Sequence, residues 1–210
     1  MTNQGNTIRV LSVDDHPVLQ EGIAALISSQ PAMELVAVAA SGREGILRFR
    51  ECTPDVTLMD LRLGDMSGID AMRAIRQDFP QARVVMLTTF GGDVEIERAL
   101  EAGACSYLLK SAASRELAEV IRCVHAGKKA IPPAVATCLA EHLGDERLTR
   151  RETEILQQIA AGNRNRGIAK KLLISEYTVK VHVKHLLEKL RAADRAQALA
   201  IGLRRGVIAL

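Results

Sequence analysis

Hydrophobic and polar residues follow two different periods along the chain. In the first 127 residues, short apolar runs rich in β-branched residues alternate with longer stretches whose apolar residues recur every three or four positions. Short apolar runs are typical of strands buried on both faces, and the longer pattern is typical of amphipathic helices. Five repeats therefore predict an α/β fold, a doubly wound five-stranded parallel sheet with helices on both faces. The expected strands are 8–13, 35–39, 56–59, 84–87 and 107–109.

After residue 127 the strand pattern stops. A Lys-Lys pair and a Pro-Pro pair interrupt the last helical stretch, so we expect a linker over 128–147 that carries a short helix of its own. Thr149 and Glu152 then have the spacing of a capping box, which marks the start of a helix. A small all-α domain follows, with expected helices at 149–161, 165–172, 176–190 and 194–205.

The charge of the chain divides between these halves. Residues 1–127 hold 12 Lys and Arg against 17 Asp and Glu, a net charge of −5. Residues 128–210 hold 16 against 8, a net charge of +8, and the whole chain carries only +3. A basic helical domain beside an acidic one predicts a polyanionic partner for the second half alone, with a solvated basic surface as the alternative.

Other compositional features exclude several classes. Aromatic residues make up 2% of the chain and Trp is absent, which disfavours single-strand binders and sugar-binding clefts. The amino terminus lacks a secretory signal pattern and no stretch approaches the ~18 apolar residues of a membrane helix, so we expect a cytoplasmic protein with no membrane partner. The cysteines are too widely spaced for a zinc or redox site, and we expect most of them to be buried: Cys52, Cys105, Cys123 and Cys138.

Acidic residues stand where two neighbouring strands of the predicted sheet end. Asp14 and Asp15 follow the first strand, and Asp60 ends the third, so the three carboxylates should meet at one edge. Like charges held this close need a cation, and hard oxygen ligands suit Mg2+. Lys110 and Thr88 would bring an ammonium and a hydroxyl to the same edge, which predicts a phosphoryl-transfer site with an Asp nucleophile. The alternative is that each acidic residue only caps a turn after its strand.

One helix of the second half has a mixed exposed face. Ile174-Ser175 turns the chain, Ser175 suits an N-cap, and the helix after it has a core face whose apolar residues lie within about 60° of one another. An apolar Val between two Lys residues on the opposite side is typical of a helix that reads the major groove of DNA. The pattern predicts a helix-turn-helix, against the alternative of an ordinary surface helix. The core residues are Val179, Val183, Leu186 and Leu190, and the exposed ones are Lys180, Val181 and Lys184.

The motifs of the first half resemble the receiver domain of two-component response regulators, which has a flavodoxin-like fold. The similarity runs from about residue 8 to 127, and we assign 6–127 to this domain. It implies no enzyme activity beyond the domain's own phosphorylation and dephosphorylation. The residues that carry it are Asp14-Asp15, Met59-Asp60, Thr88 and Tyr107-Leu108-Leu109-Lys110.

This resemblance implies a role for each site residue. Asp60 would accept a phosphoryl group from a phosphohistidine of a sensor histidine kinase. Mg2+ would bind to Asp15, Asp60 and the backbone carbonyl of Arg62, with Asp14 in support. Lys110 and Thr88 would contact the phosphoryl group, and Tyr107 would move as the switch.

The second half resembles the LuxR-type helix-turn-helix over residues 148–210. The whole chain is therefore similar to the NarL/FixJ group of transcriptional response regulators, which implies promoter DNA as a double-stranded partner and a homodimer on DNA, with RNA polymerase as a candidate further partner. Lys180, Val181 and Lys184 would contact bases, and the last helix resembles a dimerisation helix with Ala196, Leu199, Ala200 and Leu203 on one face. Four further residues are candidate phosphate contacts: Asn165, Arg166, Thr178 and His185.

The chain departs from these families at a few positions. Gly64 replaces a common Pro after the phosphoacceptor, which puts the phosphate lifetime in doubt. Gly167 lies inside a helix, at a cost of about 1 kcal/mol relative to Ala. Arg191 replaces a common Gly after the recognition helix, so we expect an irregular C-cap. The loop Phe90-Gly91-Gly92 should be mobile.

Three other functions compete with a phosphorylation-controlled regulator. An Asp-nucleophile phosphatase would carry a second acid two residues after its nucleophile, but that position is Arg62. A phosphorylation-independent regulator and a protein-binding adaptor would share the same fold.

Overall fold

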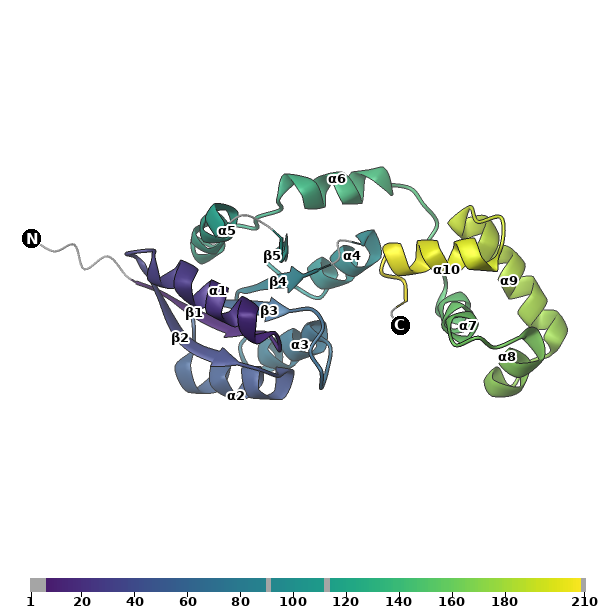
Figure 1. The fold of residues 1–210 in the computed structure, drawn as a ribbon, viewed down its shortest axis with the longest axis horizontal. Coiled ribbons are helices and arrows are strands. Elements are labelled where there is room, and N and C mark those ends of the chain that lie inside the picture. Colours follow the sequence, from purple (N-terminus) through teal and green to yellow (C-terminus); the bar gives the residue numbers. More distant parts are fainter. Residues whose placement is uncertain (1–6, 90–91, 112–113, 209–210) are drawn as a thin grey trace, which may run out of the picture. The chain divides into compact units, whose positions relative to one another are not determined.

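The computed structural model describes residues 7–89, 92–111 and 114–208 (Figure 1). They form two compact units. The first comprises the described residues within Met1–Thr89 and Ile96–Ala136, and the second those within Phe90–Glu95 and Thr137–Leu210. In the described ranges, no helix has the length and apolar character to cross a membrane.

The first unit is built on a five-stranded parallel sheet with the strand order β2-β1-β3-β4-β5. This confirms the predicted fold class, because short apolar runs form parallel strands when both faces are buried. Each observed strand overlaps a predicted one. The strands are β1 (Ile8–Val13), β2 (Met33–Ala39), β3 (Val56–Asp60), β4 (Val84–Thr88) and β5 (Ser106–Leu109).

A helix follows each strand, and local sequence signals set where it begins. Pro17 stands at the first position of its helix, where a missing N–H costs nothing. Ser41 and Ser67 cap the next two helices by accepting hydrogen bonds from the backbone N–H groups of Glu44 and Ile69. The helices are α1 (Pro17–Ser28), α2 (Gly42–Cys52), α3 (Gly68–Asp78), α4 (Asp93–Glu101) and α5 (Ser114–His125).

Alternate strand residues face opposite sides of the sheet. Val10, Leu58 and Leu108 belong to a buried cluster that α1 and α5 complete on one side. Their neighbours Met59 and Tyr107 are also fully buried, and α2 and α3 lie on the other side of the sheet (Figure 1). Both faces are therefore covered, and the carboxyl edge of the strands remains as the place for polar residues.

In the described part of the second unit, four complete helices are joined by short turns. They surround a core that includes Ile155, Ile168, Val179 and Leu186, all fully buried. A further helix, α6 (Pro133–Glu141), lies in the stretch predicted to link the domains. The four helices agree with the predicted ranges to within a few residues: α7 (Arg150–Ala160), α8 (Asn165–Leu172), α9 (Glu176–Leu190) and α10 (Arg195–Arg204).

The predicted capping box at the start of α7 is present. The Thr149 hydroxyl accepts a hydrogen bond from the Glu152 N–H at 3.3 Å, and the Thr149 N–H donates to Glu152 Oε2 at 2.8 Å. Lys189 Nζ lies 3.0 Å from the same oxygen and ties α9 to α7. Burial opposes ionisation of Glu152, but the Thr149 and Lys189 hydrogen bonds outweigh it and lower the pKa of this carboxyl.

Three helix ends in the described ranges use left-handed backbone without glycine, and the first is Thr53, which has φ 41° and ends α2. Arg191, where the sequence predicts an irregular C-cap, has φ 50° and ends α9. Leu173 has φ 54° and ends α8. Gly167 is accommodated inside α8. Of the loop predicted to be mobile, Phe90 and Gly91 lie outside the described residues.

Gly68, the first residue of α3, allows a close approach to the strand that ends at Asp60. A Cβ at position 68 would lie 1.9 Å from the Asp60 carbonyl oxygen. We predict that Gly68→Ala destabilises the first unit by about 1–3 kcal/mol, because the backbone must shift. Hydrogen exchange of β3 and β4 peptides, read by mass spectrometry, would measure the loss as faster exchange.

Gly22→Ala is the matched control, because a Cβ at position 22 meets nothing within 4 Å. It lies inside α1 and should stabilise that helix by about 0.5–1 kcal/mol. Equal protection in the Gly68→Ala and wild-type proteins would contradict the prediction.

The lowered pKa of Glu152 predicts a pH dependence. Because the folded-state pKa lies below the ordinary value of 4.5, the contribution of Glu152 to stability is present above that pH and is lost as the pH falls through the folded value. Glu152→Gln should therefore lower stability near neutral pH and flatten its decline in acid. Urea unfolding followed by circular dichroism, between about pH 3 and pH 7, would measure both effects. Glu176→Gln removes an exposed charge from the same unit and should change the slope less; equal slopes in all three proteins would refute the prediction.

Candidate functional site

Three carboxylates lie together at the carboxyl edge of the sheet. Asp14 follows β1, and Asp60 ends the neighbouring β3, where Val13 and Met59 are paired. Asp14 and Asp60 are 0% and 3% exposed, whereas Asp15 is exposed. Ligand atoms of these three residues and of His16 lie within 4.8 Å of one another. Burial of two like charges at this distance makes the edge strongly attractive to a cation.

Lys110 supplies a cation to the same carboxyl edge from the outermost strand, β5. It follows β5, and its backbone N–H donates to the Thr88 carbonyl at 2.6 Å. Its Nζ lies 2.7 Å from Asp14 Oδ2 and 2.8 Å from Asp60 Oδ2, with only 9% of the side chain exposed. The ammonium therefore bridges the two buried carboxylates.

Burial and mutual charge shift the ionisation of these groups. Burial raises the pKa of Asp60, and the Asp14 charge adds to the shift, although the Lys110 hydrogen bond opposes it. Burial alone would lower the pKa of Lys110, but the hydrogen bonds and charges of Asp14 and Asp60 outweigh it and raise that pKa. The surroundings therefore favour the protonated form of Lys110 and make Asp60 easier to protonate than an exposed aspartate.

Two further predicted residues flank this cluster. Thr88 ends β4, beside the strand that carries Asp60, and is buried. Tyr107 is the second residue of β5 and is fully buried. The sheet thus places a hydroxyl and a buried aromatic ring on the strands that follow Asp60.

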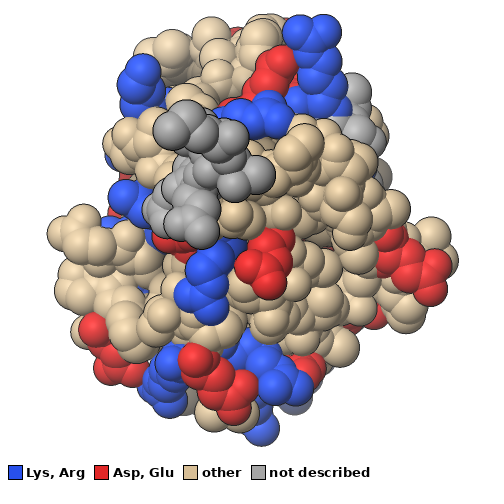
Figure 2. Space-filling view, turned by 90° about the vertical axis from the view of Figure 1, so that its left-hand side faces the viewer, with Lys and Arg blue, Asp and Glu red and all other residues tan. Residues whose placement is uncertain are grey.

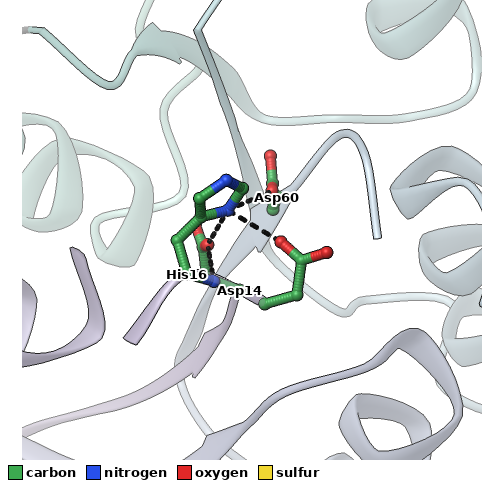
Figure 3. A group of neighbouring side chains, drawn as sticks. Asp14, His16 and Asp60 are labelled. Carbon is green, nitrogen blue, oxygen red and sulfur yellow. Dashed lines mark hydrogen bonds and ion pairs between the residues drawn. The ribbon is translucent and has the colours of Figure 1, made fainter. Parts of the chain in front are cut away.

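His16 joins the cluster, although the sequence reasoning did not single it out. Its Nδ1 lies 2.7 Å from Asp15 Oδ1, 3.1 Å from Asp14 Oδ1 and 4.0 Å from Asp60 Oδ2. Figure 3 shows the ring turned toward the carboxylates. The available signal was its place directly after the Asp pair and before Pro17, where the first helix begins.

The donor set fits a divalent cation. The carboxylates of Asp14, Asp15 and Asp60 are hard oxygen ligands, and the first and last are buried, so a bound cation would be partly shielded from water. Arg62 lies two residues beyond Asp60, and its N–H donates to Asp60 Oδ1 at 3.4 Å. The chain therefore turns tightly after Asp60. This turn keeps Arg62, whose backbone carbonyl is the expected metal ligand, close to the Asp60 carboxylate.

The loop after Asp60 is fastened at Asp65. The Asp65 carboxylate accepts hydrogen bonds from the N–H groups of Gly42 at 2.8 Å and Arg43 at 3.0 Å. These bonds lower the pKa of Asp65. Gly64 precedes this anchor, so the loop is held at the next residue even where the expected Pro is missing.

The second candidate site is the exposed face of α9. Val179 and Val183 pack into the core, while Lys180 and Lys184 are exposed and Val181 is half-buried. The structure thus places the predicted reading residues on the outer side of the helix.

Tyr177 extends this face and was missed by the sequence reasoning. Its side chain is 77% exposed. Residues 177, 181 and 184 share one side of a helix because they are four and three positions apart. An exposed aromatic ring in the first turn of α9 was recognisable only from this spacing.

The candidate phosphate contacts differ in their surroundings. Arg166 and His185 are exposed, whereas Asn165 and Thr178 are half-buried. The Asn165 side-chain oxygen accepts a hydrogen bond from Arg195, and the Thr178 hydroxyl lies 2.8 Å from that of Ser175. Asn165 therefore links the starts of α8 and α10, and Thr178 contacts the N-cap residue of α9.

The last helix leaves one side partly uncovered. On α10, Ala198 is buried in the unit's core. The predicted dimerisation residues Ala196 and Ala200 are exposed, and Leu199 and Leu203 are half-buried. This apolar side remains accessible in the described part of the unit.

Two family models match the chain. The model described as "Response regulator receiver domain" matches residues 10–122. The model described as "Bacterial regulatory proteins, luxR family" matches residues 146–201. Together they cover the sheet-edge cluster and the exposed face of α9.

Curated proteins and solved structures are similar over most of the chain. The response regulator protein VraR of Staphylococcus aureus is 40% identical over 207 residues, covering 96% of this chain and 99% of the relative. A LuxR-family two-component response regulator from Aurantimonas sp. SI85-9A1 is 40% identical over 66% of this chain and 99% of its own, with a TM-score of 0.63. RcsB of Salmonella enterica serovar Typhimurium, solved bound to promoter rprA with phosphomimetic BeF3-, is 25% identical over 93% of this chain and 98% of its own, with a TM-score of 0.66.

Proposed function

The chain belongs to the LuxR family of two-component response regulators, and we propose that phosphorylation of Asp60 controls its binding to promoter DNA. The observation that carries the proposal is the buried Asp60 carboxylate, 2.8 Å from Lys110 Nζ and beside Asp14. A nucleophile, a fixed ammonium and a set of cation ligands at one edge are the parts that phosphoryl transfer requires.

Asp60 would act as the nucleophile. One of its carboxylate oxygens forms a bond to phosphorus while the bond from phosphorus to the histidine nitrogen of a sensor kinase breaks, and the imidazole leaves. Lys110 is placed to donate hydrogen bonds to the phosphoryl oxygens, since its ammonium already lies 2.8 Å from Asp60 Oδ2. The Thr88 hydroxyl, at the end of the neighbouring strand, would donate to the same group.

Asp15, Asp60 and the Arg62 carbonyl would hold Mg2+, with Asp14 in support. When bound, Mg2+ would neutralise charge that develops on the phosphoryl oxygens. The chain's own contribution is to keep the carboxylates buried and close together, so that this edge favours a cation before the phosphoryl group arrives.

The response to phosphorylation would run from Thr88 and Tyr107 to the second half. We assign residues 6–127 to the receiver, 128–147 to the linker and 148–210 to the DNA-binding domain. The accessible side of α10 supports a homodimer on DNA. A sensor histidine kinase and RNA polymerase are the other proposed partners, and we propose a cytoplasmic location because the target is DNA.

On the DNA, Lys180, Val181 and Lys184 would contact base edges in the major groove. Lysine donates to guanine acceptors, and a valine methyl packs against the methyl group of thymine. Arg166, His185, Asn165 and Thr178 would contact phosphates and fix the register. The net charge of +8 on residues 128–210 supports a large electrostatic share of the affinity.

The phosphorylation step can be tested with acetyl phosphate and Mg2+. We predict that the full chain gains one phosphoryl group, seen by intact-protein mass spectrometry, and that Asp60→Ala abolishes the gain. Asp70→Ala removes an exposed acid of α3 and should leave the gain unchanged. No mass gain in the wild-type protein, or a gain that survives in Asp60→Ala, would refute the assignment.

The reading face can be tested on a duplex that the wild-type protein selects from a random-sequence pool. Replacing Lys180 and Lys184 by Ala should weaken specific binding at least tenfold, because base contacts contribute roughly 1–3 kcal/mol each. Fluorescence anisotropy at several salt concentrations would give the affinity and its salt slope. The Lys128→Ala/Lys129→Ala double variant removes the same charge from the linker; an equal loss in both double variants would show that charge alone, and not base contact, explains the effect.

A further inference from the structure

We propose that His16 is an additional metal ligand, which gives the sheet-edge site a preference for transition-metal cations such as Zn2+ and Mn2+ over Mg2+. This inference rests on the proposed function, because it concerns the same cation. It adds a nitrogen ligand to a site otherwise made of oxygen, and it is carried by the position of the His16 ring (Figure 3).

The backbone directs the His16 ring toward the carboxylates. His16 is the N-cap residue of α1, a position where side chains usually bond to the helix, yet its side chain makes no capping hydrogen bond. Its backbone N–H instead donates to Asp14 Oδ1 at 2.8 Å. The first turn of α1 thus holds His16 beside Asp14, and its ring is available to the carboxylate cluster.

The distances suit ligands that share one ion. With metal–ligand bonds of about 2.1 Å, neighbouring ligand atoms lie about 3 Å apart and opposite ones about 4 Å apart. His16 Nδ1 lies 2.7 Å from Asp15 Oδ1, 3.1 Å from Asp14 Oδ1 and 4.0 Å from Asp60 Oδ2. The first two values match neighbouring positions, and the third matches an opposite one.

Lys110 and His16 meet at Asp60 but contact different oxygens of Asp14. Lys110 Nζ lies 2.8 Å from Asp60 Oδ2, so a cation beside His16 would share that oxygen with the ammonium. Lys110 binds Asp14 through Oδ2, whereas the ring of His16 faces Oδ1 of the same carboxylate. The imidazole and the ammonium therefore lie against different oxygens of Asp14. A cation beside His16 would not have to displace the Lys110 ion pair with Asp14.

Imidazole changes which cation binds best. Carboxylate and carbonyl oxygens suit Mg2+, while imidazole nitrogen suits Zn2+ and other first-row transition metals. For a mixed nitrogen and oxygen site the affinity of first-row divalent ions rises from Mn2+ to Cu2+ and is lower again for Zn2+. His16 should therefore raise the affinity for these ions and leave that for Mg2+ dependent on the carboxylates. The competing explanation is that His16 is only a hydrogen-bonding partner of Asp14 and Asp15.

Pulsed electron paramagnetic resonance of Mn2+ bound to the full, tag-free chain separates the two explanations. We expect a coupling from directly bound 14N, which changes to that of 15N when the protein is labelled with 15N-histidine and disappears when excess Mg2+ displaces Mn2+. The labelling needs no variant, so the test stands even if substitutions disturb folding. A Mn2+ signal without nitrogen coupling would overturn the proposal.

Calorimetric titrations measure the selectivity. His16→Asn and His16→Gln should lower the ratio of Zn2+ to Mg2+ affinity by about tenfold, a loss typical for one ligand-shell partner. His125→Asn, on α5, is the control for loss of a histidine outside the cluster and should keep the wild-type ratio. A wild-type ratio in both His16 variants would contradict the proposal.

Phosphorylation of the wild-type protein with acetyl phosphate and Mg2+ distinguishes failure of the His16 proposal from failure of the proposed phosphorylation of Asp60. If Asp60 is phosphorylated but Mn2+ shows no nitrogen coupling, the role of His16 is wrong and the proposed function stands. If nitrogen is bound but Asp60 accepts no phosphoryl group, the metal site stands and the phosphorylation mechanism is wrong.

Discussion

The burial of Asp14 and Asp60 side by side is the constraint on which the first unit depends. Two carboxylates removed from water repel each other, and each would be far more stable apart. Lys110 makes the arrangement tolerable by bridging both at 2.7 and 2.8 Å. The three residues come from the ends of β1, β3 and β5, so the parallel order of the strands is what brings them together. The folding of the sheet therefore holds two like charges together that would otherwise separate.

The fold was predictable because its physical causes are local and periodic. Apolar runs such as 56–59 leave no polar face, which excludes an exposed strand and requires helices on both sides. Thr149 and Glu152 mark a helix start by side-chain bonds within four residues, and the structure has both bonds. Asp14 and Asp60 each stand at the carboxyl end of a strand. In a parallel sheet in which these two strands are neighbours, the two carboxylates must lie close together.

The rest depended on side-chain direction and backbone detail that the sequence does not carry. His16 precedes a Pro in the chain, but nothing in that order says whether the ring turns toward Asp14 or toward water. Leu173 adopts a left-handed conformation that favours Gly, so the residue type does not reveal it. The spacing of Tyr177 puts it on the side of α9 that carries Val181 and Lys184, but its exposure follows from how α9 packs.

The hydrogen bonds that hold Asp65 at the start of α2 have a consequence for the phosphorylation proposed at Asp60. Two backbone N–H groups hold this loop residue, and a bridge between Arg62 and Ser67 closes the same turn. Asp60, the proposed nucleophile, thus stands next to a fastened turn and would lose little conformational freedom on reaching the geometry of attack. Folding would already have ordered the Asp60 carboxylate, so its effective molarity toward a bound phosphoryl donor would be high. A proline at position 64 would restrict the backbone of this loop. The hydrogen bonds of Asp65 already restrict it at the next residue, so Gly64 adds less freedom than it would in an unanchored loop.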